Sequence, residues 1–231
     1  MWRDRCDSPL QVTEVRKELP GFYVRRKREL ELALNTIPPH PRPRVELEQY
    51  ATPSTLASTL LWIAEFHFGD ISGKKVLDLG SGTGRLGIGA VLLGASVATL
   101  LDIDPDSLEV AKKWSQDAGV YAFLDLVAAD VNELPFRENF SFETVIQNPP
   151  FGVHRKGSDV AFLRSALRCA HVVYSIHKET SLEYILSVVR RWGAQATVLH
   201  RDRICLPPMF EWHRKRVYCF RVAVIRVERS T

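Results

Sequence analysis

The feature that most constrains the fold of this 231-residue chain is a glycine-rich stretch directly after a short apolar run. Val76–Leu79 predicts a buried strand, three glycines follow within residues 80–84, and the apolar segment 84–93 predicts a helix. Glycines at a strand-to-helix turn let the backbone pass close to a ligand where a Cβ would intrude. The stretch therefore predicts a parallel α/β sheet with a binding site at the carboxyl end of its first strand.

The same strand–helix alternation continues toward the carboxyl terminus, which predicts a doubly wound sheet. Two late strands with no helix apparent between them predict a final antiparallel hairpin. We expect an α/β fold with a mostly parallel, seven-stranded, Rossmann-like sheet. The other expected strands cover residues 96–101, 121–128, 142–147, 171–175, 194–200 and 217–227, and the other expected helices cover 105–118, 159–170 and 181–192.

The N-terminal segment lacks this strand–helix alternation. Residues 1–46 predict an N-terminal extension, with a helix over 25–35 and a proline-rich linker over 38–43, and residues 47–231 predict the main domain. Residues 1–24 are weakly periodic and indicate no role.

Charge is distributed unevenly along the chain. Residues 51–150 hold 6 Lys+Arg and 13 Asp+Glu, whereas residues 151–231 hold 15 and 6. A basic block of this kind favours a polyanion such as nucleic acid, although solvated Arg and Lys surfaces are also common.

The cysteines and the apolar segments indicate the setting of the protein. Four scattered cysteines, at positions 6, 169, 205 and 219, indicate neither a disulfide framework nor a metal site, so we expect no metal. A reducing, cytoplasmic location is the corresponding expectation. The longest uncharged stretch, Leu86–Leu101, is too short to span a membrane, and no secretory signal is visible, so we expect no membrane partner.

Two ligand patterns overlap in the glycine loop. Gly82, Gly84 and Gly87 fit a dinucleotide fingerprint, whereas Asp78 with the three loop glycines fits S-adenosylmethionine. A pyrophosphate requires a helix N-terminus without an acidic neighbour, but a sulfonium and an ammonium group favour a carboxylate. Asp102, at the end of the next strand, can accept ribose hydroxyls in either case. The aspartate at position 78 therefore favours S-adenosylmethionine, with Ile103 and Asp130 placed to contact an adenine.

The most specific motif is the tetrapeptide Asn148-Pro149-Pro150-Phe151, which follows the fourth strand. Two prolines stiffen the loop, so the Asn148 oxygen and the Pro149 carbonyl can accept from one NH2 group. The Phe151 ring can stack on the planar group that carries this amine. The motif predicts methylation of a planar amino or amide nitrogen, with catalysis by orientation and electrostatics.

These motifs together resemble class I S-adenosylmethionine-dependent methyltransferases, and in particular the methyltransferase-like protein 5 family. The resemblance implies that the chain places N6-methyladenine in small-subunit ribosomal RNA. One departure is Ala51, where the family usually has proline. The matching segments are Leu47–Thr52, Asp78–Gly84, Asp102–Asp104, Asn148–Gly152, Ala161–Leu163, Tyr174–Lys178, Leu206–Pro207 and His213–Arg216.

The resemblance also implies roles for individual residues. Asn148 to Phe151 would hold the target adenine, and Arg85 would act through its backbone alone. A small zinc-containing activator protein would pair with the third strand, although residues 1–24 could cover that edge instead. Expected cofactor contacts are Gln49, Thr52, Asp78, Gly80, Gly82, Thr83, Gly84, Arg85, Asp102, Ile103, Asp130 and Val131, and expected RNA contacts are His177, Lys178, His213, Arg214, Lys215 and Arg216.

Three other functions remain open from the residues alone. A protein glutamine-N5 methyltransferase also uses an Asn-Pro-Pro-aromatic loop, but usually with tyrosine at the aromatic position and with a larger N-terminal domain. An inert binding or scaffold protein could keep the same fold. A nicotinamide oxidoreductase is disfavoured because no hydride-transfer residues are evident.

Overall fold

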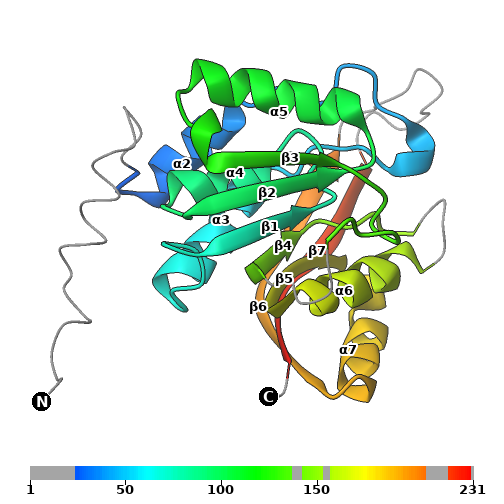
Figure 1. Ribbon diagram of the computed structural model, residues 1–231. Helices are drawn as coiled ribbons and strands as arrows, with labels where there is room; N and C mark the ends of the chain where they lie inside the picture. The colour runs from blue at the N-terminus through cyan, green and yellow to red at the C-terminus, as the bar shows by residue number, and fades with distance from the viewer. Residues whose placement is uncertain (1–23, 137–141, 153–156, 207–217, 230–231) are drawn as a thin grey trace, which may run out of the picture.

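The computed structural model describes residues 24–136, 142–152, 157–206 and 218–229. It contains a seven-stranded sheet in the order β3-β2-β1-β4-β5-β7-β6 (Figure 1). The first five strands run parallel, and β7 is antiparallel to both β5 and β6. The expected fold class, with its C-terminal antiparallel hairpin, is confirmed. The strands are β1 (Lys75–Leu79), β2 (Val97–Asp102), β3 (Leu124–Ala128), β4 (Phe142–Gln147), β5 (Ala170–Lys178), β6 (Ala194–Leu206) and β7 (Tyr218–Arg229).

Helices cover both faces of the sheet. Buried residues of α2, α3, α4 and α5 share one hydrophobic cluster, and those of α6 and α7 share the other. Within the described residues, no helix is long and apolar enough to cross a membrane. The helices are α2 (Lys27–Asn35), α3 (Ser54–Phe66), α4 (Arg85–Leu92), α5 (Pro105–Asp117), α6 (Ser158–Cys169) and α7 (Leu182–Arg191), with short 3-10 turns η1 (Val45–Leu47), η2 (Tyr121–Phe123) and η3 (Glu179–Ser181).

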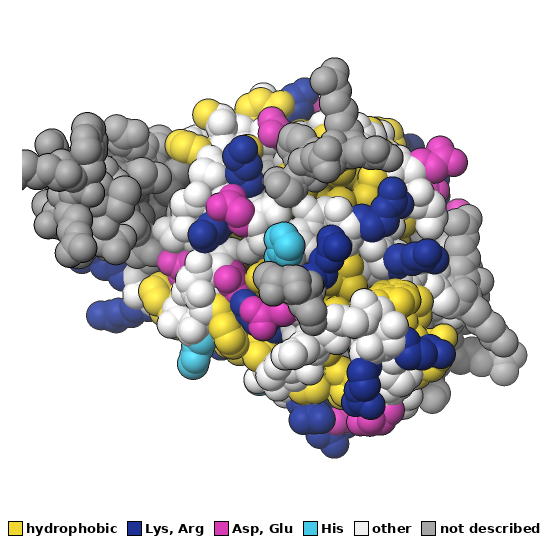
Figure 2. Space-filling view, turned by 60° about the horizontal axis from the view of Figure 1, so that its bottom comes forward, with side chains coloured by type: hydrophobic (Ala, Val, Ile, Leu, Met, Phe, Trp, Pro, Cys, Tyr) yellow, Lys and Arg dark blue, Asp and Glu magenta, His cyan; other side chains and the backbone are white. Residues whose placement is uncertain are grey.

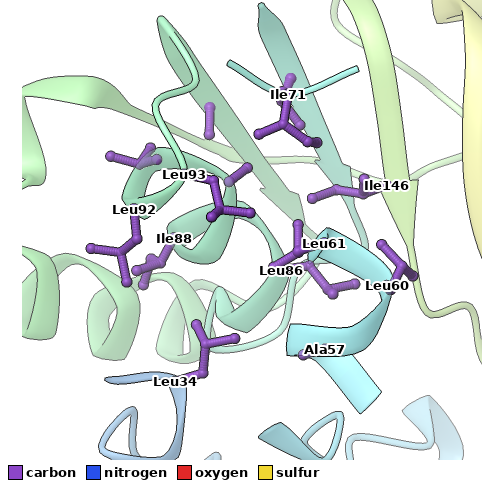
Figure 3. Packing of buried hydrophobic residues seen from close by; sticks show 14 of the residues in the cluster. Leu34, Ala57, Leu60, Leu61, Ile71, Leu86, Ile88, Leu92, Leu93 and Ile146 are labelled. Atoms are coloured by element: carbon purple, nitrogen blue, oxygen red, sulfur yellow. The ribbon is translucent and has the colours of Figure 1, made fainter. Parts of the chain in front are cut away.

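The helix that was expected in an N-terminal extension is part of the main core. Leu30 and Leu34 of α2 are fully buried, and Ile37 is 1% exposed. Figure 3 shows Leu34 directed toward the cluster that α3 and α4 form with the sheet. Each such side chain contributes about 1.5–3 kcal/mol by burial. The expected boundary at residue 46 therefore does not mark the edge of the core, because α2 packs in the same cluster as α3 and α4.

The third strand lies at a sheet edge, but it is shorter than expected. Tyr121–Phe123 forms the turn η2, and β3 covers only Leu124–Ala128. This strand pairs with β2 alone among the described strands. The Phe123 N–H donates to the Val120 carbonyl oxygen at 3.1 Å, so it closes a turn instead of joining the sheet ladder.

The final hairpin corrects the expectation that no cysteines pair. Cys205 of β6 and Cys219 of β7 are directly opposite in the antiparallel register, and they form a disulfide. Their separation of 14 residues conceals this proximity in the sequence. Cys169 is free and buried.

The basic charge of the C-terminal third is spread over the surface. Figure 2 shows Lys and Arg side chains distributed among hydrophobic ones, with fewer acidic side chains, over the lower face of the view in Figure 1. Arg164 and Arg168 of α6 are exposed, as are Arg190 and Arg191 of α7. These four arginines are thus solvated side chains on helices, and they make up four of the 15 Lys and Arg residues of residues 151–231.

Candidate active site

A cavity of about 200 Å³ opens at the carboxyl ends of β1, β2 and β4. It is bounded by the loops after these strands, by the segment after β3 and by residues 46–52, which precede α3. Gly84, Pro149 and Phe151 are the predicted site residues in the described part of these loops that do not line it. The predicted residues that do line it are Gln49, Thr52, Asp78, Gly80, Gly82, Thr83, Arg85, Asp102, Ile103, Asp130, Val131, Asn148 and Pro150.

The glycine loop fits closely between β1 and α6. Gly80 has a left-handed backbone (φ +71°), and a Cβ at this position would lie 2.5 Å from the Phe162 ring. Any other residue would strain the backbone and displace the ring. The loop is thus held against α6 with its backbone open to the cavity.

Asp78, at the end of β1, has one occupied oxygen and one unoccupied oxygen. Its Oδ2 accepts a 2.7 Å hydrogen bond from the Gly87 N–H, and its Oδ1 is buried without a partner. Burial raises the pKa of Asp78 to about 7, the Gly87 hydrogen bond opposes this shift, and the nearby charge of Asp102 adds to it. An unpaired buried carboxylate oxygen is costly unless a ligand satisfies it. Asp78 therefore suits a cationic ligand group.

Asp102, at the end of β2, closes the glycine loop. Its Oδ2 accepts from the Gly82 N–H at 2.7 Å, and its Oδ1 accepts from the Asp104 N–H at 2.9 Å. Burial raises the pKa of Asp102, and these two backbone donors oppose the shift. Two carboxylates therefore lie against the glycine loop and the first turn of α4, at the Gly82 and Gly87 amides. An anionic pyrophosphate is disfavoured beside them, so the dinucleotide interpretation loses its support.

Residues 40–52, here called the strap, are tied to the end of β2 through Asp104. The Asp104 Oδ2 lies 3.0 Å from His40 Nε2, 2.6 Å from Gln49 Nε2 and 2.9 Å from a terminal nitrogen of Arg44. Burial alone would raise the pKa of Asp104, but the hydrogen bonds from Gln49 and Arg44 outweigh it and lower the pKa to about 2. Gln49 also accepts from the Arg44 N–H. Both ends of the Gln49 amide are therefore bound within the protein.

The tetrapeptide places an unoccupied acceptor at the cavity. Asn148 Nδ2 donates to the Thr52 hydroxyl at 2.9 Å, whereas Asn148 Oδ1 is buried with no partner. Asn148 lines the cavity. Its free oxygen can therefore accept a hydrogen bond from a ligand amine.

Phe151 lies in an aromatic cluster. Its ring stacks on Tyr50 with centroids 5.5 Å apart, and meets Phe220 of β7 edge-on at 5.2 Å. Lys178 Nζ lies 5.3 Å from the Phe151 centroid and 5.1 Å from that of Phe220. Lys178, which was expected near RNA or the substrate loop, therefore lies beside the Phe151 ring of the tetrapeptide.

Two predicted roles are wrong. The Arg85 side chain does matter, because its guanidinium donates to the backbone oxygens of Thr52 and Ile37 at 2.7 and 3.1 Å. His177 is fully buried, with Nε2 2.8 Å from the Ser175 hydroxyl, and burial lowers its pKa to about 4. Because the imidazole is buried, it cannot contact RNA. His213, Arg214, Lys215 and Arg216 lie outside the described residues.

Other functional candidates were not identified from the sequence. Glu48 accepts a hydrogen bond from the Phe151 N–H at 2.7 Å, and Tyr50 stacks on the same residue. Both residues belong to the segment Leu47–Thr52, whose match to the family was the signal in the sequence that could have identified them. Arg201 and Arg221 both pair with Glu179, at 3.2 and 2.8 Å, and only the strand register reveals their proximity.

Comparison with known proteins decides the family. Residues 57–171 match the family model of the methyltransferase small domain. The chain is 34% identical to the rRNA N(6)-adenosine-methyltransferase METTL5 of Danio rerio, over 86% of this chain and 97% of that protein. It is also 34% identical to the Drosophila melanogaster rRNA N(6)-adenosine-methyltransferase Mettl5, over 88% and 97%. The chain belongs to the methyltransferase-like protein 5 family.

A solved structure agrees with this membership. The crystal structure of PH1948 from Pyrococcus horikoshii superimposes with a TM-score of 0.79 at 36% identity, covering 89% of this chain and 97% of that one. Methyltransferase-like protein 5 enzymes take their methyl group from S-adenosylmethionine, and the residues here fit that group. The unpaired Asp78 Oδ1 suits its cationic end, and Ile103, which is 48% exposed at the cavity, offers an apolar surface to its adenine.

Proposed function

We propose that this protein transfers a methyl group from S-adenosylmethionine to N6 of an adenosine in ribosomal RNA, and specifically in small-subunit RNA. The observation that carries the proposal is the buried, unpartnered Asn148 Oδ1 at the cavity. An acceptor without a donor beside a carboxylate-lined cofactor pocket suits an incoming NH2 group. The rRNA activity in the printed names of the relatives supports the same substrate.

The tetrapeptide then acts by orientation rather than by strong base catalysis. Bound S-adenosylmethionine supplies an electrophilic methyl group on a sulfonium. Asn148 Oδ1 accepts from the adenine N6–H, which holds the amine and directs its lone pair toward the cavity. When N6 takes the methyl group, the methyl–sulfur bond would break and the sulfonium would leave as a neutral thioether. N6 would become positive, and the Asn148 oxygen would stabilise that charge before the proton leaves to solvent. The aromatic cluster around Phe151 offers a stacking surface for the base.

Transfer of tritium from labelled S-adenosylmethionine tests this proposal. Small-subunit RNA, large-subunit RNA, DNA and total protein compete as acceptors, and nucleoside analysis identifies the product. We expect N6-methyladenosine in small-subunit RNA. Asn148→Ala should lower turnover about a hundredfold while S-adenosylmethionine affinity stays within about twofold. Label in protein glutamine would instead establish the amide-methylating alternative.

RNA contacts are proposed for the described cations around the carboxyl end of β5. Lys178 lies beside the Phe151 ring, and Arg203 is opposite Arg221 in the β6–β7 register. Arg201 and Arg221 share one carboxylate, that of Glu179. Their side chains are 50% and 67% exposed, so the pairs are open to exchange with phosphate.

A partner at the edge of the sheet is also proposed. Leu126 and Val127 of β3 are half-buried, and β3 has no strand beyond it among the described residues. An open edge favours pairing with another chain. We propose that a small zinc-containing activator adds a strand there, and the competing possibility is coverage by residues 1–24, which lie outside the described residues except for Val24.

The mass of the protein in solution separates these two possibilities. Alone, the wild type should aggregate, and with the activator present it should form a complex of higher mass. Phe123→Lys or Leu126→Lys should weaken activator binding, with thermal melting as the folding control. A fully active, soluble monomer that ignores the activator would exclude the partner.

A further inference from the structure

Three side chains of the strap contact the tetrapeptide. Glu48 Oε2 accepts from the Phe151 N–H at 2.7 Å, and Thr52 Oγ1 accepts from Asn148 Nδ2 at 2.9 Å. Between these two contacts, the Tyr50 ring stacks on the Phe151 ring with an interplanar angle of 27°. The strap therefore contacts both functional ends of the tetrapeptide, its amide and its aromatic ring.

The Glu48 carboxylate supplies an acceptor for a backbone N–H of the tetrapeptide. Pro149 and Pro150 have no N–H, so the Phe151 N–H is the first backbone donor after Asn148. A carboxylate is the strongest acceptor available for it. Glu48 adopts a left-handed backbone (φ 50°, ψ 41°), which among the described residues is otherwise confined to glycines. Unfavourable backbone conformations persist where the surroundings impose them, often at functional sites.

The Thr52 contact binds the amide nitrogen of Asn148. With Nδ2 engaged, Oδ1 remains as the buried atom without a partner. Thr52 is itself 8% exposed, and its backbone oxygen is held by the Arg85 guanidinium. Arg85 thus holds the Thr52 backbone, and the hydroxyl on that backbone binds the Asn148 amide.

We propose that Thr52 and Glu48 are positioning residues, which hold Asn148 and Phe151 in the geometry for methyl transfer and need not touch the cofactor. This inference rests on the proposed function, and it reassigns Thr52 from the cofactor contacts that the sequence predicts. The strap thereby becomes part of the substrate site, because it fixes the residues that hold the acceptor.

Kinetics of Thr52 variants separate positioning from cofactor binding. Thr52→Val should lower kcat by about tenfold to a hundredfold, with KM and S-adenosylmethionine affinity by calorimetry changed less than about threefold. Thr52→Ser keeps the hydroxyl and should restore most of kcat. The matched control is Thr59→Val on α3, which also removes a hydroxyl acceptor, that of Lys27. Weaker cofactor binding by Thr52→Val with unchanged kcat would overturn the assignment.

Hydrogen exchange of the Phe151 amide, measured by NMR on the free protein, tests the Glu48 contact without any acceptor or cofactor. Glu48→Ala should accelerate exchange at Phe151 and lower kcat, and Glu48→Gln should restore part of both. The control is Glu65→Ala, because the Glu65 carboxylate accepts from the Ser72 N–H at 2.8 Å far from the tetrapeptide. Unchanged exchange and kcat in Glu48→Ala would refute the role.

The two proposals can fail separately. If the wild type methylates an acceptor other than RNA adenosine, the RNA function fails, and the kinetic series is run on that acceptor. Loss of kcat in Thr52→Val with rescue by serine then still supports positioning. Equal turnover in all variants on the true acceptor overturns it.

Discussion

Replacing Asp104 by asparagine should destabilise the protein in a pH-dependent manner. The ordinary pKa of an aspartate is 3.8, and in the folded protein the pKa of Asp104 is about 2. At about 1.4 kcal/mol per pH unit, this difference contributes about 2 kcal/mol of stability. Its source is the hydrogen bonds from Gln49 and Arg44 to Oδ2 and from the Asp106 N–H to Oδ1, which outweigh the cost of burial.

The sign of the pH dependence follows from the direction of the pKa difference. Because the pKa of Asp104 is lowered by folding, its contribution is fully present well above pH 3.8 and is lost as pH falls toward 2. Asp104→Asn should therefore cost about 2 kcal/mol at pH 7 and about half of that at pH 3. An asparagine also directs NH2 hydrogens at existing donors, which adds to the cost.

Urea denaturation of both proteins at the two pH values measures the effect. Asp106→Asn is the control, because Asp106 pairs with Arg42 at 2.9 Å on the surface, with side chains 52% and 82% exposed. Such a pair is worth about 1 kcal/mol or less. A difference between Asp104→Asn and wild type that is the same at pH 7 and pH 3 would refute the charge-based reasoning, since a purely steric defect would not titrate.

Two further predictions concern ligands. Since burial raises the pKa of Asp78 to about 7, S-adenosylmethionine affinity should rise with pH through 7 as this carboxylate ionises, and Asp78→Asn should flatten the profile in calorimetry. Persistence of the rise in the variant would assign it to another group. Replacing Arg201, Arg203 and Arg221 together by glutamine should lower the salt slope of RNA binding by about one unit or less per lost contact. The same change at exposed Arg190 should leave the slope unaltered, and an unaltered slope in the triple variant would place RNA elsewhere.

The fold could be predicted from the sequence because its signals are local. Apolar runs, the glycine loop and helix periodicity lie within segments of ten to fifteen residues, and they locate the parallel strands closely. The expected length was wrong for β6, which was expected to end at His200 but continues to Leu206 because it pairs with β7 over that whole length. The start of β7 at Tyr218 is within one residue of the expected position. The Cys205–Cys219 pair depends on that register and has no local signal.

The sequence predicted the site residues that belong to recognisable motifs, but not the contacts between residues that are distant in the chain. Asp78, Asp102 and Asn148 stand at strand ends, and their side chains meet at one cavity. His177 could not be placed, because the sequence does not show that β5 continues through Lys178 and buries the imidazole. The role of the Arg85 side chain could not be predicted either, because its two carbonyl partners lie 33 and 48 residues away in the sequence.

The strap explains why the cofactor pocket and the substrate loop form one site. Gln49 contacts Asp104 at the end of β2, and its neighbours Glu48 and Tyr50 contact Phe151 after β4. A single short segment thus bridges the two strand ends that flank β1 in the sheet. Because Asp104 anchors this segment through three side chains, loosening the anchor should shift residues that touch the tetrapeptide, even though Asp104 itself does not. Asp104 is thereby linked, through the strap, to the position of the tetrapeptide that would hold the methyl acceptor.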